Sequence, residues 1–126
     1  MSVYLYINAA LYLVLAVWCT LSPWKTASNI GYETLSAGGR SEYLVIYGGL
    51  QLGFAGIFAL LARADPGTQR LGILISLCLY APIVAYRVVT VTKFWPVAGL
   101  TLGVGALEVA LLLAAVVLYL RSASVS

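Results

Sequence analysis

The stretch that decides the fold is residues 97–120, VAGLTLGVGALEVALLLAAVVLYL. Its one charged residue is Glu108, and the other positions are apolar, small or weakly polar. About 20 such residues are enough for a helix to cross the hydrocarbon core of a bilayer. The stretch therefore predicts a transmembrane helix with a single carboxyl group inside it.

Three further runs of the chain have the same character. They cover residues 3–21, 43–62 and 71–91. The last of these contains Arg87, and the other two contain no charged residue. We expect an all-α protein, a single transmembrane domain over residues 1–126 whose four helices form an antiparallel bundle.

The overall composition agrees with a membrane location. Hydrophobic residues make up 63% of the 126 residues and charged residues 9%, whereas soluble domains average about 45–50% and about 25%. A soluble domain of this size could not bury so much apolar surface, because small domains leave a large share of their surface exposed. We therefore expect an integral membrane protein in contact with membrane lipid.

Charge and residue counts argue against several classes of function. The formal net charge is +3, but the seven Lys and Arg residues are scattered and form no patch that could follow a phosphate backbone. We therefore expect no nucleic-acid partner. The chain has no His, so the commonest zinc and haem ligand is missing, and we expect neither a metal site nor a His-dependent catalytic triad.

The connections predict which helices are neighbours. Residues 92–96 form a very short turn, which places the third and fourth helices side by side and antiparallel. Residues 63–70 form a polar turn rich in helix breakers. Within the longest connection, residues 22–42, we expect a short interfacial helix over residues 26–35.

The glycines predict close approaches between helices. Gly49 and Gly53 form one pair of small residues four positions apart, and Gly99 and Gly103 form another. Such pairs let two helix backbones approach each other in a membrane. We expect both pairs to lie at helix–helix contacts.

The two cysteines are not expected to form a disulfide. Cys19 lies near the end of the first helix and Cys78 well inside the third. The rise of a helix separates them in depth by about 15 Å, whereas a disulfide needs Cα atoms within about 7 Å. We interpret both as small packing residues.

The two charges inside the predicted spans are the most informative residues. A charged side chain at the centre of a transmembrane helix costs about 2.5–3.5 kcal/mol on insertion scales. Arg87 and Glu108 lie on neighbouring helices and differ in depth by about 9 Å, which a long arginine can span directly or through a water. They form a packing ion pair, the polar floor of a ligand site, or a site with a proton-bearing carboxyl. Alternatively, Arg87 extends to the interface and leaves Glu108 protonated.

The second helix offers polar side chains that could join this site. Tyr43, Tyr47 and Gln51 recur every four residues and so share a face of a regular helix, with Glu42 just above them. A polar side chain at this depth must find a partner inside the bundle, as must Asn8 of the first helix. Ordinary hydrogen bonding between helices and the lining of a pocket are both open for these residues.

The stretch RSEYLVIYGGLQLG, residues 40–53, resembles the signature of a small bacterial family of four-span membrane proteins in the DoxX-like group. That family also has an Arg late in the third span and a Glu in the fourth, which Arg87 and Glu108 match. The resemblance implies a four-helix bundle in a bacterial inner membrane. It favours one set of site residues, namely Glu42, Tyr47, Gln51, Arg87 and Glu108. Some distant relatives are linked to quinone-dependent sulfur oxidation, but no residue here supplies a redox centre, so the resemblance names no substrate.

The orientation rests on a few basic residues. Four spans place both termini on the same side as the 63–70 turn, together with Arg63, Arg70 and Arg121. The other side holds Lys25, Arg40 and Lys93, so the positive-inside count is a tie. Because the three arginines lie directly at helix ends, we expect the termini to be cytoplasmic.

Four functions follow from these features. The first is binding of an apolar or amphipathic small molecule, such as a lipid, quinone or isoprenoid, with its polar head near Arg87, Gln51 and Glu42. The second is a role as an accessory or structural subunit of a larger membrane complex, or as a homo-oligomer. A proton-coupled exporter is less favoured, because small four-span exporters use a carboxylate in the first span. A membrane enzyme would need Glu108 or Glu42 as its acid or base, and no catalytic residue or cofactor is assigned.

Overall fold

The computed structural model describes residues 1–123, and these residues are helical apart from short connections. The elements are α1 (Ser2–Leu21), α2 (Pro23–Asn29), α3 (Ala37–Leu44), the π-helical segment η1 (Val45–Leu50), α4 (Gln51–Ala62), α5 (Pro66–Lys93) and α6 (Gly99–Ala123). The described part of the chain contains no strand. The expected all-α, four-helix class is confirmed.

Four helical segments are long and apolar enough to cross a membrane. They are Ser2–Leu21, the continuous segment Ala37–Ala62, Pro66–Lys93 and Gly99–Ser122. Much of their apolar surface faces outward, including many large aliphatic side chains. Exposing such a surface to water is costly, whereas exposing it to lipid is not, so the four helices are those of an integral membrane protein.

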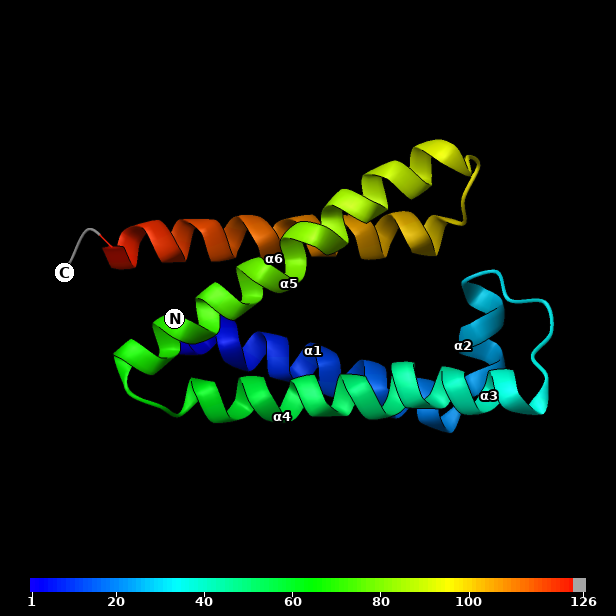
Figure 1. The fold of residues 1–126 in the computed structure, drawn as a ribbon, viewed down its shortest axis with the longest axis horizontal. Helices are drawn as coiled ribbons and strands as arrows, with labels where there is room; N and C mark the ends of the chain where they lie inside the picture. The colour runs from blue at the N-terminus through cyan, green and yellow to red at the C-terminus, as the bar shows by residue number, and fades with distance from the viewer. Residues whose placement is uncertain (124–126) are drawn as a thin grey trace.

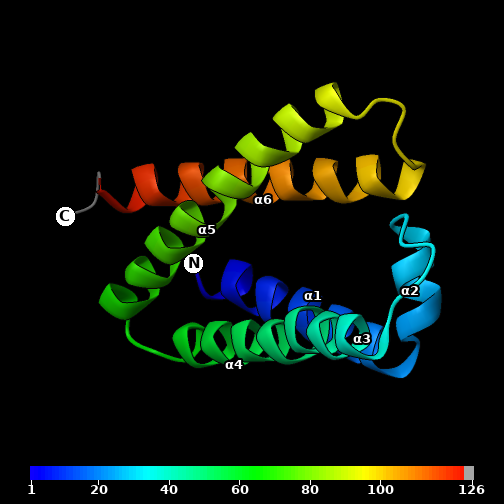
Figure 2. The same ribbon diagram turned by 45° about the vertical axis from the view of Figure 1, so that its right-hand side comes forward.

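The four spans form two antiparallel pairs, α1 with α4 and α5 with α6 (Figure 1). Helix α5 connects the pairs, because its first half contacts α1 and α4 and the rest of it runs along α6. Its 28 residues span about 42 Å, more than the hydrocarbon core of about 30 Å. It lies obliquely to α6 in both views (Figure 2). The start of α1, the end of α6 and the α4–α5 turn share one end of the molecule, and α2, α3 and the α5–α6 connection share the other.

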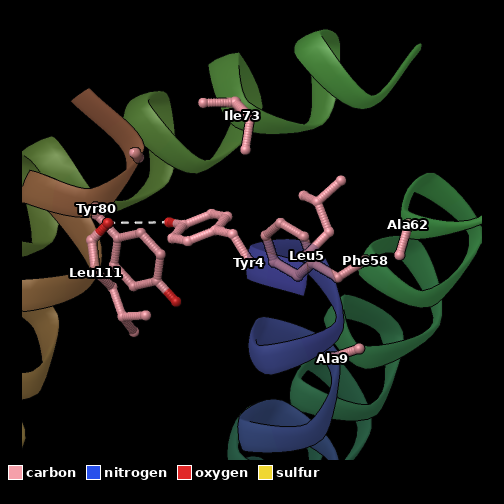
Figure 3. Packing of buried hydrophobic residues seen from close by; sticks show 9 residues of the cluster. Tyr4, Leu5, Ala9, Phe58, Ala62, Ile73, Tyr80 and Leu111 are labelled. Atoms are coloured by element: carbon pink, nitrogen blue, oxygen red, sulfur yellow. Dashed lines mark hydrogen bonds between the residues drawn. The ribbon is translucent and has the colours of Figure 1, made fainter. Parts of the chain in front are cut away.

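The core lies where the first half of α5 meets α1 and α4 (Figure 3). Leu5, Phe58 and Ile73, from these three helices, are fully buried. Gly72 is required there, because a Cβ at this position would lie 3.0 Å from a methyl group of Leu5. The tight packing holds the α1–α4 pair against α5, and α5 in turn positions α6.

Side-chain caps define two helix starts. The Ser36 hydroxyl accepts a hydrogen bond from the Gly39 backbone N–H, so the second span begins at Ala37, before the predicted apolar run. Asp65 caps α5, because its carboxylate accepts bonds from the N–H groups of Gly67 and Thr68. The interfacial helix predicted over residues 26–35 is misplaced. It occupies Pro23–Asn29 instead, because Pro23 favours the first turn of a helix and Gly31, with φ 97°, follows its end.

The prediction for the glycine pairs was wrong. Among the described residues, no atom of another element would lie within 4 Å of a Cβ at Gly49, Gly53, Gly99 or Gly103. The close approach in the second span is at Gly48, where a Cβ would lie 2.7 Å from the Thr20 hydroxyl oxygen. A spacing of four positions identifies a helix face made of small residues. It does not show whether the neighbouring helix packs on that face. Cys19 and Cys78 are free thiols, as predicted.

Candidate functional site

Arg87 and Glu108 form a bidentate ion pair between α5 and α6. The Arg87 Nε–H donates to Glu108 Oε2 at 2.9 Å, and the Nη2–H donates to Oε1 at 2.7 Å. The side chain of Arg87 is 31% exposed and that of Glu108 15%. Paired N–H groups match the two carboxylate oxygens in geometry, and such bonds are stronger than neutral ones. Of the arrangements predicted for these two charges, the structure shows direct contact.

The arginine reaches the carboxylate because residue 105 is a glycine. A Cβ at Gly105 would lie 3.2 Å from Cγ and 3.4 Å from Cδ of Arg87. The methylene chain of Arg87 therefore lies across the backbone of α6 one turn before Glu108. Sequence reasoning missed Gly105, although its place three residues before an intramembrane carboxylate is a usable signal.

An apolar groove of about 280 Å³ runs between α5 and α6 beside the ion pair. Its walls are mostly aliphatic, including Val84, Val88, Val91, Leu102, Ala106 and Val109. Arg87 lines the groove, and Thr92 and Thr101 supply the remaining polar side chains. Several of its lining side chains, including Val88, Leu102 and Val109, are exposed at the surface of the helix pair. An apolar chain could therefore enter it sideways, with a polar group beside Arg87.

A second polar cluster joins α1, α5 and α6. The Tyr80 hydroxyl donates to Asn8 Oδ1 at 2.6 Å, and Asn8 Nδ2 donates to the Tyr4 carbonyl at 2.9 Å. The Tyr4 hydroxyl donates to the Leu111 carbonyl at 3.0 Å (Figure 3). Asn8 thus finds the buried partner that its depth required, and Tyr80 is a residue that sequence reasoning missed. Glu108 is close enough to Tyr80 to interact with it electrostatically, so the cluster borders the ion pair.

Tyr47 forms an aromatic stack on the second span. Its ring stacks on that of Tyr43 with centroids 4.6 Å apart, and the Tyr43 hydroxyl donates to Thr26 at 2.9 Å. The stack therefore joins α2 to the second span. Tyr47 and Arg87 are within electrostatic range of each other, but the structure shows no hydrogen bond between them in residues 1–123.

The side-chain oxygen of Gln51, Oε1, is buried without a hydrogen-bond partner among the described residues. Leaving a buried acceptor unpaired costs about 1–3 kcal/mol. Gln51 follows η1, and π-helical turns are rare and frequent at functional sites. This oxygen is available to a donor from outside the chain.

The five predicted site residues are thus not one contact cluster. Arg87 and Glu108 touch, and Tyr47 is near them. Within residues 1–123, Gln51 makes no side-chain hydrogen bond to the pair. Glu42 is exposed at the α3 end of the second span, and the same residues offer it no side-chain hydrogen bond or ion pair. The π-helical turn explains part of this, because it changes the rotation per residue between Tyr43 and Gln51.

The chemistry of the site follows from its charge balance. Glu108 neutralises Arg87, so an added anion would have to compete with an existing bidentate pair. An arginine has about five N–H donors, and two of them are used here. The remaining N–H groups have no hydrogen-bond partner in residues 1–123 and can donate to a carbonyl or hydroxyl oxygen. The described part of the chain holds no group of three or more metal-ligating side chains.

Comparison of the chain with family models, curated proteins and solved structures finds no match.

Proposed function

We propose that the protein binds a small amphipathic molecule, such as a lipid, quinone or isoprenoid, within the membrane. The observation that supports this function is the groove of about 280 Å³ between α5 and α6, apolar along its walls and bordered by Arg87. Sites for small molecules are mostly apolar and contain a few polar groups that fix orientation. The groove has this composition, and several of its lining side chains are exposed at the surface of the helix pair.

The polar head of this ligand is uncharged and carries an acceptor oxygen. A phosphate would be drawn to Arg87 but repelled by Glu108, which lies 2.7 Å from the same guanidinium. A quinone carbonyl or an isoprenoid hydroxyl needs no countercharge and can accept a hydrogen bond from the unused N–H groups. The polar side chains of Thr92 and Thr101, which also line the groove, are uncharged as well, so the lining favours a neutral head.

The test compares two substitutions on α6. Ala106→Phe fills the groove, because Ala106 lines it, whereas Ala110→Phe places the same ring on an exposed position outside the groove. Neither substitution replaces a residue of the ion pair. Each protein is extracted in a mild detergent, and the molecules that remain bound are quantified by mass spectrometry.

We expect Ala106→Phe to reduce the bound neutral amphiphile about tenfold or more, which corresponds to about 1.4 kcal/mol of binding free energy. Ala110→Phe should retain the wild-type amount. Equal retention by both variants, or equal loss, would show that the groove is not the binding site.

A second candidate is an accessory subunit of a membrane complex, or a homo-oligomer. The observation that favours it is the row of Gly49, Gly53 and Gly56, at none of which a Cβ would meet an atom of another described element within 4 Å. Small residues on an outer face permit close contact with another helix. Leucine substitutions at Gly49 and Gly53 should then reduce the particle mass in native purification, and an unchanged monomeric mass would eliminate this role.

We also propose that the protein lies in a bacterial inner membrane, that its termini are cytoplasmic and that it belongs to the DoxX-like group. The four apolar spans support a membrane location, and the arginines at the α4–α5 turn and at the end of α6 support cytoplasmic termini. Cysteine labelling at residue 68, by substitution of the half-buried Thr68 in the first turn of α5 in a variant with Cys19 and Cys78 replaced, reports the side directly.

A further inference from the structure

A second groove lies at the opposite end of the molecule from the α5–α6 connection. It has a volume of about 500 Å³ and lies where α5 begins and α6 ends. Its lining is Met1, Pro66, Gly67, Arg70, Leu118, Arg121 and Ser122. Two arginines from different helices therefore face one groove that also has apolar walls.

Basic side chains gather at this end of the molecule. Arg63, Arg70 and Arg121 lie there, and Asp65 is the acidic side chain of the described residues at the same end. Asp65 is engaged with the first N–H groups of α5 and with the hydroxyl of Thr68. In residues 1–123 the ion pair of Arg87 with Glu108 is the one recorded, so no described carboxylate pairs with Arg70.

Arg70 is held in place without a countercharge. Its guanidinium carbon lies 5.3 Å from the centre of the Tyr119 ring on α6, and cation–π contact of this kind leaves the N–H edge of the guanidinium available. Arg70 is four residues into α5, about 6 Å from its start, and Arg121 is near the end of α6. Both therefore lie at the depth of lipid headgroups.

We propose that this groove binds the phosphate of an anionic phospholipid, with an acyl chain against Leu118. Arginine matches phosphate oxygens in pairs, and basic pockets between transmembrane helices at the membrane surface are suited to anionic headgroups. The site is independent of the groove beside Arg87, which favours a neutral head. It also differs from a general basic surface, because two side chains converge on a volume large enough for a headgroup.

The experiment uses the full chain in nanodiscs of equal parts phosphatidylglycerol and phosphatidylcholine, with retained lipid measured by native mass spectrometry after release. Arg70→Gln and Arg121→Gln are made singly and together. The control is Arg63→Gln, which removes the same charge from the same end but does not line the groove. Inorganic phosphate is added in a separate arm to distinguish a free anion from a lipid.

We expect the wild type to retain phosphatidylglycerol in preference to phosphatidylcholine. Retention should fall about fivefold for each groove arginine and about 25-fold for the double variant, from about 1 kcal/mol per basic residue at the surface. Arg63→Gln should keep the wild-type preference, and millimolar phosphate should not displace the lipid. Equal loss in Arg63→Gln, equal retention of both lipids, or displacement by phosphate would each overturn the proposal.

Discussion

Arg87 reaches Glu108 by lying across Gly105, whose absent Cβ would be 3.2 Å from Cγ of the arginine. The ion pair thus depends on a third residue that carries no charge. This relationship links the packing of α5 on α6 to the polar border of the apolar groove, because the same arginine lines that groove.

Gly105→Ala and Gly103→Ala should have different effects on stability. Alanine in place of glycine within a helix normally gains about 0.8–1.0 kcal/mol, and Gly103 has open space around it. At Gly105 the added methyl group displaces Arg87, which removes most of that gain. Unfolding in mixed detergent micelles measures both values, and an equal gain at the two positions would show that Arg87 is not constrained by α6.

Removing one partner of the ion pair should cost more than removing both. Arg87→Gln or Glu108→Gln leaves a charge without its partner inside the membrane, which costs about 3–5 kcal/mol for a fully buried pair. We expect the lower end of this range, because the Arg87 side chain is 31% exposed. The double variant should be less destabilised than either single variant. Additive losses in this double-mutant cycle would mean that the two residues do not interact.

Tyr80→Phe should destabilise the protein by about 1–3 kcal/mol, because it leaves the buried Oδ1 of Asn8 without a donor. Tyr86→Phe is the matched control on the same helix. Tyr86 is 75% exposed, and its loss of a hydroxyl group should change the free energy of unfolding very little. Similar values for the two variants would contradict the role of Tyr80 in fixing α1 against α5.

Gly48→Ala should destabilise the contact of α1 with η1 by about 1–3 kcal/mol, the usual range for overpacking. The new methyl carbon would lie 2.7 Å from the Thr20 hydroxyl oxygen. Thr20→Ala in the same chain should recover most of the loss, and Gly49→Ala should cause none. Failure of Thr20→Ala to rescue stability would show that the clash lies elsewhere.

The cap of α5 should make stability depend on pH. The hydroxyl of Thr68, together with the N–H groups of Thr68 and Gly67, lowers the pKa of Asp65 below its ordinary value of 3.8. A carboxyl whose pKa is lowered in the folded state contributes fully above its unfolded pKa, and the contribution is lost as pH falls through the folded pKa. The melting temperature of the wild type should therefore exceed that of Asp65→Ala at neutral pH, and the difference should shrink below pH 3.8. A difference that grows on acidification would contradict this assignment.

The sequence predicted the fold class, and it placed Arg87 and Glu108 on neighbouring helices within reach of each other, with direct contact as one of several open arrangements. Apolar runs of spanning length predict helices, and a short connection between two of them predicts neighbours. The depth of each charge then follows from the helical rise. These steps need no knowledge of how the helices rotate about their axes.

The predictions that were wrong or incomplete depend on how each helix is rotated about its axis. The pairs beginning at Gly49 and Gly99 have the spacing of contact faces, yet the contacts are made by Gly48, Gly72 and Gly105. The π-helical turn over Val45–Leu50 also changes which side chains share a face, so Tyr47 and Gln51 cannot be placed together by counting in fours. Tyr80 was missed because its partner, Asn8, lies 72 positions away in the chain.

The most direct test of the binding function is photo-crosslinking in the native membrane. The probe is an isoprenoid alcohol with a photoreactive group on its chain, and an unlabelled isoprenoid alcohol is the competitor. We predict saturable labelling of the α5–α6 groove, at peptides containing Val88, Leu102 or Val109, which Ala106→Phe abolishes and Ala110→Phe does not. Labelling spread evenly over the lipid-facing sides of α1 and α4, insensitive to competitor and to Ala106→Phe, would contradict a binding site between α5 and α6.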